Sequence, residues 1–454
     1  SVFLYSRRKN VKKEGLLLLY KAEWGIKLID YVGKKYPRTL KVLSYVSIGV
    51  GYLLMITMVY FFFKIMYLYI TTDIVQIIKV PPIMPLFPYV TSAFNLGLPP
   101  FYFFYFIVVL AVIAITHELA HGIFAARDDI KIKSTGFGFF PFFLPIFLAA
   151  FVEPDENQMQ KKSKFSQMAV LSAGTFANVL TAILFFFVLW GFFAAAFAPA
   201  GVVFNDYATV VVPIAGITKV NDVLLQEQSY EKIVELAEKD LNEVYFGEER
   251  FFVSKDLLIR SKNTEELMVL YLDTPAINEG VEGAIVEFDG VEIKSHESLV
   301  EVLYSNSPGD EVVLKTKTDE GIKEYSIILE EHPEDNSKPW LGVGFVNNER
   351  SGVLGRIYSF MGSFKDPNVY YEPKFDGFSE FIYNLLWWLV LISFSVALIN
   401  MLPVGMFDGG RFFFLTVWGI TGSEKFAKKS FAFVTYLILF LLLVLMGIWF
   451  FSLF

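Results

Sequence analysis

Long apolar stretches alternate with polar segments along the chain. A helix that crosses the roughly 30 Å hydrocarbon core of a bilayer needs about 20 mostly apolar residues. Five windows meet this requirement, and they begin at Val42, Phe103, Met168, Leu385 and Phe431. The pattern therefore predicts an α-helical multi-pass membrane protein with about five transmembrane helices.

A sixth apolar segment, residues 136–152, differs from these windows. Its two glycines and two prolines, Gly136, Gly138, Pro141 and Pro145, disfavour a continuous helix. Backbone of this kind enters a membrane only where protein or a cavity covers its polar groups. We therefore expect a membrane-re-entrant β-loop.

The segment 202–345 is polar, with short strand-like runs and turns, and is expected to form a soluble α+β insert of ordinary domain size. The remaining chain divides into a basic N-terminal segment, an additional transmembrane helix and the two parts of a membrane core. The expected boundaries are 1–41, 42–71, 101–200 and 380–454.

The distribution of Lys and Arg predicts on which side of the membrane each segment lies. Residues 1–41 are rich in Lys and Arg, which places them in the cytoplasm by the positive-inside rule. Three of the five crossings precede the insert, which places it outside the cytoplasm. It carries about thirty acidic and about a dozen basic residues, a balance that the rule tolerates there. The expected location is a cell membrane, and the composition fits a prokaryote, including an archaeon.

Composition limits the possible chemistry. Hydrophobic residues make up 54% of the chain and cysteine is absent. Thiolate metal sites and cysteine nucleophiles are therefore excluded, and a metal would need histidine and carboxylate ligands. The chain has four histidines, and His296 and His332 lie in the polar insert, where an ordinary surface role is expected.

The other two histidines lie in the motif His117-Glu118-Leu-Ala-His121, within the apolar window that begins at Phe103. Polar or charged groups near mid-bilayer cost about 2.5–3.5 kcal/mol on insertion scales, so they need partners or a function. Residues four apart share one helix face, where two histidines bind zinc and the glutamate takes a proton from water. A solvated helix face, the ordinary alternative, is not available in this window.

A catalytic zinc site needs a third protein ligand, commonly a carboxylate. Asp408 is the candidate. It comes after the fourth apolar window and after the helix-breaking Pro403, and two glycines follow it. His117 lies towards the cytoplasmic end of its window, so both elements are expected in the same leaflet. The alternative is an ordinary turn aspartate beside a glycine pair.

Three motifs together resemble the site-2 protease family of intramembrane zinc metalloproteases, peptidase family M50. They are HELAH, the span SAGTFAN with Gly174 and Asn178, and Asn400-x-x-Pro403 leading to Asp408-Gly409. The resemblance implies one zinc held by His117, His121 and Asp408, with Glu118 as the catalytic base. It also implies that the substrates are transmembrane helices of membrane proteins. Thr175 departs from the family, in which many members have proline.

The resemblance also suggests how substrate is held. Gly136-Phe137-Gly138 resembles the family's GxG motif in a β-loop that presents an edge to substrate. We expect the loop 136–147 to pair with an unwound substrate backbone. Asn178, Asn400 and Pro403 are further candidates for substrate binding, although the two asparagines fit interhelical hydrogen bonding equally well.

Residues 273–317 of the insert resemble a PDZ domain, a common insert of this family. A PDZ fold binds a peptide as an added strand, but filtering of bulky substrates fits this sequence better because no clear carboxylate-binding loop is present. Residues 205–266 are not assignable to a second copy. Membrane lipid is the other expected partner, and no nucleic acid is expected.

Two other functions remain open. A membrane zincin that cuts soluble or prenylated peptides also uses HExxH, but with a downstream glutamate as third ligand. A zinc transporter or a non-catalytic metal-binding protein would use intramembrane histidines without needing Glu118. Such a transporter usually has further ligands along a path, yet no other histidine lies in any apolar window.

Overall fold

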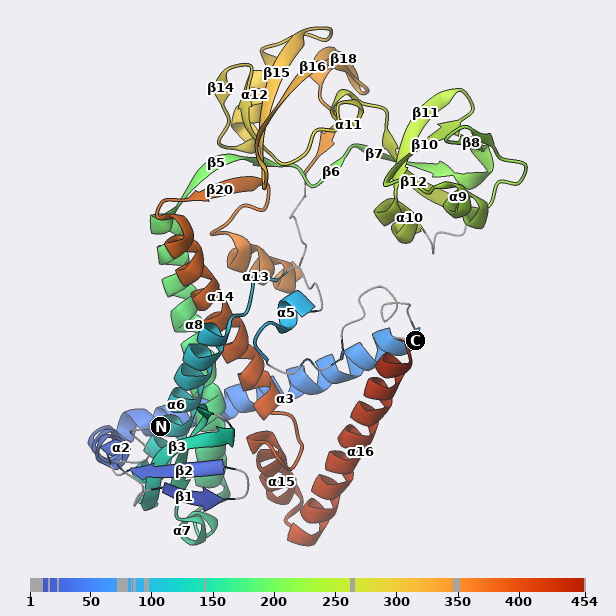
Figure 1. Cartoon of the computed structure of the whole chain (residues 1–454). Coiled ribbons are helices and arrows are strands. Elements are labelled where there is room, and N and C mark those ends of the chain that lie inside the picture. The colour runs from blue at the N-terminus through green and yellow to red at the C-terminus, as the bar shows by residue number, and fades with distance from the viewer. Residues whose placement is uncertain are drawn as a thin grey trace. The chain divides into compact units, whose positions relative to one another are not determined.

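The computed structural model describes residues 11–14, 17–22, 24–71, 81–82, 84, 87–93, 98–142, 144–261, 266–345 and 352–452 (Figure 1). The basic residues Arg7, Arg8 and Lys9 therefore lie outside the described part. The chain divides into two compact units, of which unit 1 comprises residues 1–192 and 380–454 and unit 2 comprises residues 193–379.

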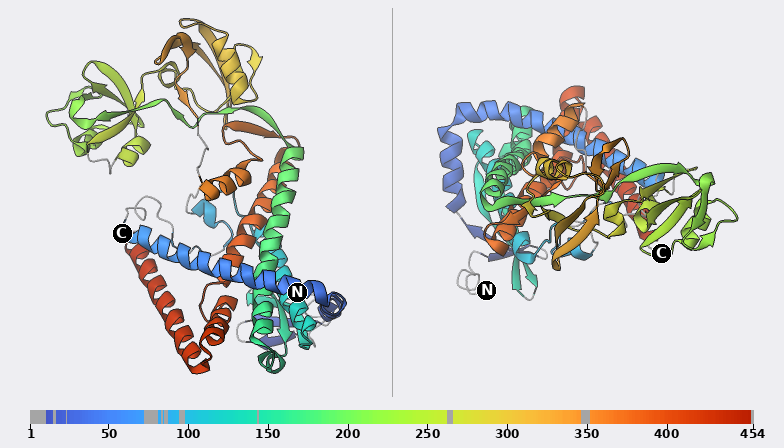
Figure 2. Two further views of the ribbon diagram at one scale, coloured as in Figure 1. Left: turned by 180° about the vertical axis from the view of Figure 1, so that it is seen from behind. Right: turned by 90° about the horizontal axis from the view of Figure 1, so that it is seen from above.

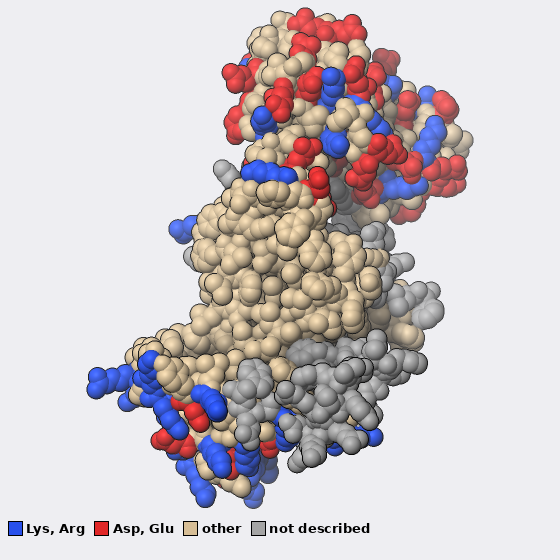
Figure 3. All heavy atoms as spheres, turned by 60° about the vertical axis from the view of Figure 1, so that its left-hand side comes forward, with Lys and Arg blue, Asp and Glu red and all other residues tan. Residues whose placement is uncertain are grey.

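Among the residues that the structure describes, five helices are long and apolar enough to cross a membrane, which confirms the five predicted windows. They are α3 (Pro37–Thr71), α6 (Phe103–Arg127), α8 (Lys164–Ala196), α14 (Asp376–Asn400) and α16 (Glu424–Phe451). Many large apolar side chains on them are exposed, including Leu53, Phe187 and Leu443. Figure 3 shows a wide surface over these helices without charged side chains, as lipid contact requires.

The segment predicted as a β-loop forms a hairpin of β3 (Ile132–Phe142) and β4 (Leu144–Pro154). Two N-terminal strands extend it, β1 (Val11–Glu14) and β2 (Leu17–Ala22), giving an antiparallel sheet in the order β1-β2-β3-β4. This extension was not predicted, because strand partners so far apart in sequence leave no local pattern.

The position of β2 corrects one expectation. Gly136, Phe137 and Gly138 lie on β3, which pairs with β2 on one side and β4 on the other. These residues therefore present no free strand edge. A Cβ added to Gly136 would lie 2.0 Å from the carbonyl oxygen of Tyr20, so the close approach of β2 explains this glycine. At the other side of the sheet, β4 pairs with no further described strand.

Helix α2 (Trp24–Lys35) joins this sheet to the membrane helices and packs against α6. Figure 1 and the left view of Figure 2 show α2 and the sheet beside the same end of α6. Glycines permit the contact. A Cβ on Gly33 would lie 2.8 Å from the Ala126 Cβ, and one on Gly122 would lie 2.7 Å from the Ile29 Cδ1. Ile29 is fully buried in an apolar cluster with residues of α6 and α8, so α2 is part of the core of unit 1.

Substitution Gly33→Val tests this packing. The added atoms have no space beside Ala126 and the Ile123 carbonyl oxygen, 3.0 Å from the Cβ position, and overpacking costs about 1–3 kcal/mol. We expect a lower thermal unfolding midpoint in detergent. The control is Gly49→Val on α3, because nothing lies within 4 Å of that Cβ position. Equal midpoints for the two variants would contradict a tight α2–α6 contact.

The other elements of unit 1 are short. Helix α5 (Val90–Ala93) precedes α6, and α7 (Glu156–Gln160) joins the hairpin to α8. Helix α15 (Asp408–Thr421) lies between α14 and α16 and packs against α16. An ion pair of 2.6 Å joins Arg411 of α15 to Glu156 of α7. It links the helix that begins with Asp408 to the segment after β4.

The described residues of unit 2 form two six-stranded sheets with separate apolar cores, and two pairs of short strands. The first sheet has the order β7-β12-β11-β10-β8-β9, and the second has the order β16-β15-β13-β5-β20 with β14 paired to β13. The elements of the first are β7 (Thr209–Pro213), β8 (Ile217–Val220), β9 (Val223–Leu224), α9 (Tyr230–Leu236), β10 (Leu241–Phe246), β11 (Glu249–Ser254), α10 (Lys255–Ser261) and β12 (Leu267–Leu272).

The elements of the second are β5 (Phe197–Val203), α11 (Pro275–Asn278), β13 (Ala284–Phe288), β14 (Val291–Glu292), α12 (His296–Tyr304), β15 (Glu311–Thr318), β16 (Gly321–Ile328) and β20 (Val369–Pro373). Further elements are β6 (Asp206–Tyr207) paired with β19 (Val343–Gly344), β17 (Glu330–His332) paired with β18 (Asp335–Trp340), and α13 (Gly352–Gly362).

One arrangement occurs in both sheets. A hairpin turns at a residue with positive φ, Asn221 in the first and Asp289 in the second. A serine then caps the next helix, Ser229 for α9 and Ser295 for α12. The following strand pairs on both sides, as β8-β10-β11 and β13-β15-β16. The elements β8 to β11, which lie in the stretch that the sequence left unassigned, thus repeat the strand–helix–strand order of the following module.

The junction of the two modules carries a polar network. Arg250 on β11 donates two hydrogen bonds of 2.9 Å to the Asp273 carboxylate and one to the Asn278 side chain on α11. Burial raises the pKa of Asp273, but the bonds from Arg250 and Asn278 outweigh burial and lower it. The carboxylate is therefore ionised at neutral pH, as the Arg250 contact requires.

Candidate metal centre

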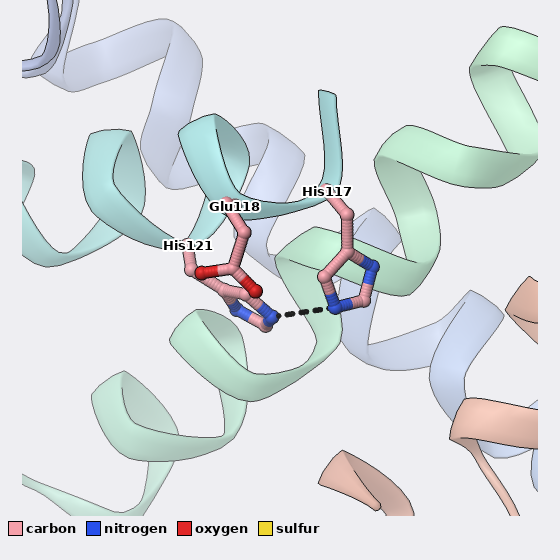
Figure 4. A group of neighbouring side chains, drawn as sticks. All are labelled: His117, Glu118 and His121. Carbon is pink, nitrogen blue, oxygen red and sulfur yellow. Dashed lines mark hydrogen bonds between the residues drawn. The ribbon is translucent and has the colours of Figure 1, made fainter. Parts of the chain in front are cut away.

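Helix α6 carries the three polar side chains of the HELAH motif. The four-residue spacing places His117 and His121 one turn apart on the same face of the helix, with Glu118 beside them (Figure 4). Their Nε2 atoms lie 3.0 Å apart, and the rings are close to perpendicular. The side chain of each imidazole is only 11–12% exposed. Both rings thus direct the same nitrogen towards one point.

Asp408, the first residue of α15, reaches the same point from almost three hundred residues away. Its Oδ2 lies 3.2 Å from His117 Nε2 and 3.3 Å from His121 Nε2. The turn before α15 is tight. A Cβ on Gly409 would lie 2.3 Å from the Met401 carbonyl carbon, and one on Gly410 would lie 2.3 Å from the Val404 carbonyl oxygen. The two glycines therefore let Asp408 approach α6.

These distances fit a tetrahedral zinc ligand set. Zinc–nitrogen and zinc–oxygen bonds of about 2.0 Å in tetrahedral geometry separate the ligand atoms by about 3.3 Å. The three observed separations are 3.0, 3.2 and 3.3 Å. Neutral imidazole and carboxylate are also ligands that zinc accepts. The residues present therefore fit a zinc ion.

Helix α8 leaves space for this group at Gly174. A Cβ there would lie 2.4 Å from His121 Nε2 and 2.7 Å from His117 Nε2. Any side chain would therefore press on the two nitrogens that face Asp408. The glycine of the SAGTFAN segment is explained by the space that the imidazoles need.

The far nitrogen of each ring is also held by α8. His121 Nδ1 lies 2.6 Å from the Val170 carbonyl oxygen, and His117 Nδ1 lies 3.0 Å from Asn178 Nδ2. Asn178 is fully buried, and its Oδ1 has no hydrogen-bond partner among the described residues. Of the two roles expected for Asn178, the structure shows a contact between helices, which lies behind the ring.

Glu118 contacts the sheet. The backbone N–H of Val152 on β4 donates a hydrogen bond of 2.9 Å to Glu118 Oε2. A pocket beside Glu118 is lined by Ala150 and Val152 of β4, by Gly136 and Phe137 of β3, and by Gly25 of α2. The outer edge of β4 is thus directed at the carboxylate of the HELAH motif.

The model of peptidase family M50 matches residues 105–445, more than half of the chain. The chain belongs to peptidase family M50, the site-2 protease family. Members of this family are membrane-bound zinc metalloproteases, so the protein is a membrane metalloprotease by family. The match begins after α2, so β1, β2 and α2 lie outside it.

Two further comparisons add little. No curated protein sequence matches the chain. Among solved structures, the PDZ domain of an SdrC-like protein from Listeria monocytogenes is 26% identical. The match covers 16% of this chain and 78% of that one, with a TM-score of 0.15. This similarity is too weak to support an argument about the insert.

The structure brings most M50 motif residues to one place. His117, Glu118, His121, Asp408 and Gly174 surround a single point, and Gly136 and Phe137 line the adjoining pocket. Gly138 is placed one residue further along β3. Pro403 is buried in the turn before Asp408, and Asn400 is half-buried at the end of α14.

Sequence reasoning missed three contacts of this M50 site, those of Val152, Val170 and Gly25. The first two act through backbone atoms, which every residue has, and therefore carry no signal in the sequence. Gly25 lies outside the family match and in no motif.

The Asp408→Asn variant should bind zinc far more weakly, because a neutral amide is a poorer ligand than a carboxylate. We expect zinc affinity to fall by more than about a hundredfold. Loss of a residue that only hydrogen-bonds a metal ligand already lowers affinity by up to about a hundredfold. The measurement is zinc content after dialysis against a chelator. The control is the exposed Asp319→Asn in the insert. Unchanged zinc content in Asp408→Asn would rule out ligation by this residue.

Proposed function

We propose that this protein is a zinc endopeptidase that hydrolyses peptide bonds within or near transmembrane helices of other membrane proteins. One observation carries the proposal. The Asp408 carboxylate lies within 3.3 Å of both imidazoles, and these belong to a helix that is apolar and long enough to cross a membrane. Glu118 lies beside this group, as a hydrolytic site requires.

Zinc, when bound by His117, His121 and Asp408, supplies a Lewis acid that makes water nucleophilic near neutral pH and polarises a carbonyl. Glu118 accepts the proton from the attacking water and later donates it to the leaving amine. The hydrogen bond from Val152 N–H orients one carboxylate oxygen of Glu118 and leaves the other to accept this proton.

The edge of β4 is the proposed site of substrate pairing. A helix hides its carbonyls in internal hydrogen bonds, so the substrate must be extended before cleavage. An extended strand can add to a sheet edge through backbone hydrogen bonds. The outer edge of β4 lies at Glu118, whereas β3 already pairs on both sides. Gly136 and Phe137 then shape the pocket beside Glu118. Asn400 and Pro403, which shortly precede Asp408 in the chain, are the further residues that we propose to contact substrate.

The proposal keeps the expected placement in a cell membrane. The basic N-terminal segment is cytoplasmic, the insert lies outside the cytoplasm, and lipid surrounds the five helices. We further propose that the second module of the insert is PDZ-like and limits the size of the substrates that reach the membrane core. Capture of a peptide at this module is the alternative.

Reconstitution tests the function. The protein is incorporated into vesicles with a single-span helical reporter, and products are identified by mass spectrometry. We expect cleavage inside or near the apolar span, loss of cleavage with a chelator and recovery with zinc. The same vesicles report zinc flux, the property of a transporter. Flux without cleavage would replace the proposed function with transport.

A further inference from the structure

Asn178 of α8 is a buried polar residue whose contact with His117 the proposed reaction leaves unexplained. Its side chain is fully buried and its Nδ2 lies 3.0 Å from His117 Nδ1. Its Oδ1 is buried and has no hydrogen-bond partner within the part of the chain that the structure describes. A buried polar atom without a partner costs about 1–3 kcal/mol, so the arrangement needs an explanation.

The contact of His121 shows which ring nitrogen must carry the hydrogen. Its Nδ1 faces the Val170 carbonyl oxygen at 2.6 Å, and a carbonyl can only accept. Nδ1 of His121 therefore carries the hydrogen. The Nε2 of the neutral ring is then bare and free to bind a metal. The backbone of α8 thus fixes the tautomer that ligation requires.

His117 also needs its hydrogen on Nδ1 to bind a metal through Nε2, but the Asn178 amide presents its Nδ2 donor to that Nδ1. An Nδ2 donor at Nδ1 would leave the hydrogen on Nε2, the atom that faces Asp408 at 3.2 Å. A ring protonated on Nε2 has no lone pair for a metal there. The two ends of an asparagine amide differ by little in shape, and their assignment follows from the hydrogen-bond network.

We infer that Asn178 is a positioning residue that accepts a hydrogen bond through Oδ1 from His117 Nδ1–H when zinc is bound. Exchanging the amide ends places Oδ1 against His117 Nδ1–H and leaves Nε2 of His117 bare. The Nδ2 group then takes the buried position that has no hydrogen-bond partner among the described residues. Both histidines are then held alike by α8, His121 by a backbone carbonyl and His117 by a side-chain carbonyl. This inference rests on the proposed zinc site.

Two variants separate this role from simple packing. Asn178→Asp keeps an acceptor of nearly the same shape and cannot donate, whereas Asn178→Leu keeps the volume and does neither. Loss of an outer partner of a metal-bound histidine typically reduces affinity about 10–100-fold. We expect that loss in Asn178→Leu and an affinity in Asn178→Asp within a few-fold of wild type or tighter.

Zinc affinity is measured by competition with a chelator in detergent, and metal-free thermal midpoints report folding. Equal affinity of Asn178→Leu and wild type would overturn the inference. Asn178→Asp as weak as Asn178→Leu would also overturn it, because the amide would then act as donor or filler. If Asn178→Leu does not fold, Asn178→Asp alone decides.

The outcome is separable from the proposed function because no cleavage is measured. Zinc binding with the expected order of affinities, but without reporter cleavage, would leave the inference standing and remove the proteolytic function. Wild-type protein that binds no zinc would overturn both.

Discussion

The Glu118→Gln variant should lose reporter cleavage by about 10²–10⁴-fold, the usual contribution of a general base, while it still binds zinc. Glutamine has nearly the shape of glutamate and its side-chain oxygen can still accept the Val152 N–H bond. It cannot take a proton from water at neutral pH. Rate of cleavage and zinc content are measured on the same preparation.

The control for this variant is Glu301→Gln, an exposed residue of the insert, which should cleave at the wild-type rate. Cleavage by Glu118→Gln at the wild-type rate would remove Glu118 from the mechanism. Loss of zinc together with activity would show instead that Glu118 maintains the metal site.

The Gly174→Ala variant should bind almost no zinc. The added methyl group would lie 2.4 Å from His121 Nε2 and 2.7 Å from His117 Nε2, far inside van der Waals contact. The rings would have to turn away from Asp408, and the three ligand atoms would no longer meet. The measurement is zinc per chain after purification, with affinity from chelator competition.

Gly191→Ala is the matched control, because it lies on the same helix with nothing within 4 Å of its Cβ position. Alanine favours helix by about 1 kcal/mol over glycine at both positions. Helix propensity therefore cannot explain a loss confined to Gly174. Wild-type zinc affinity in Gly174→Ala would show that the ligands do not meet at this face of α8.

The sequence predicted the elements whose evidence is local. Each of the five helices follows from one continuous apolar window, and the spacing of His117 and His121 places them on one helix face. The cost of burying these groups indicated a metal, and Asp408 was found because it combines an acid with an apolar setting and a glycine pair. The structure places all three together.

The parts that were missed depend on contacts between distant segments. The pairing of β2 with β3 joins residues more than a hundred positions apart, and no residue of β2 signals its partner. The roles of Val152 and Val170 rest on backbone atoms. The first module of unit 2 could not be assigned from the sequence. Its hairpin turns at Asn221-Asp222, whereas the second module has Asp289-Gly290 at that place, so the turn signals differ.

X-ray absorption at the zinc edge of the purified wild-type protein tests the central claim most directly. The account predicts one zinc per chain with two imidazole nitrogens and carboxylate oxygen at about 2.0–2.2 Å. It also predicts that the imidazole signal halves or the zinc is lost in His121→Ala. Zinc whose surroundings are the same in wild type, His121→Ala and Asp408→Asn would contradict the account.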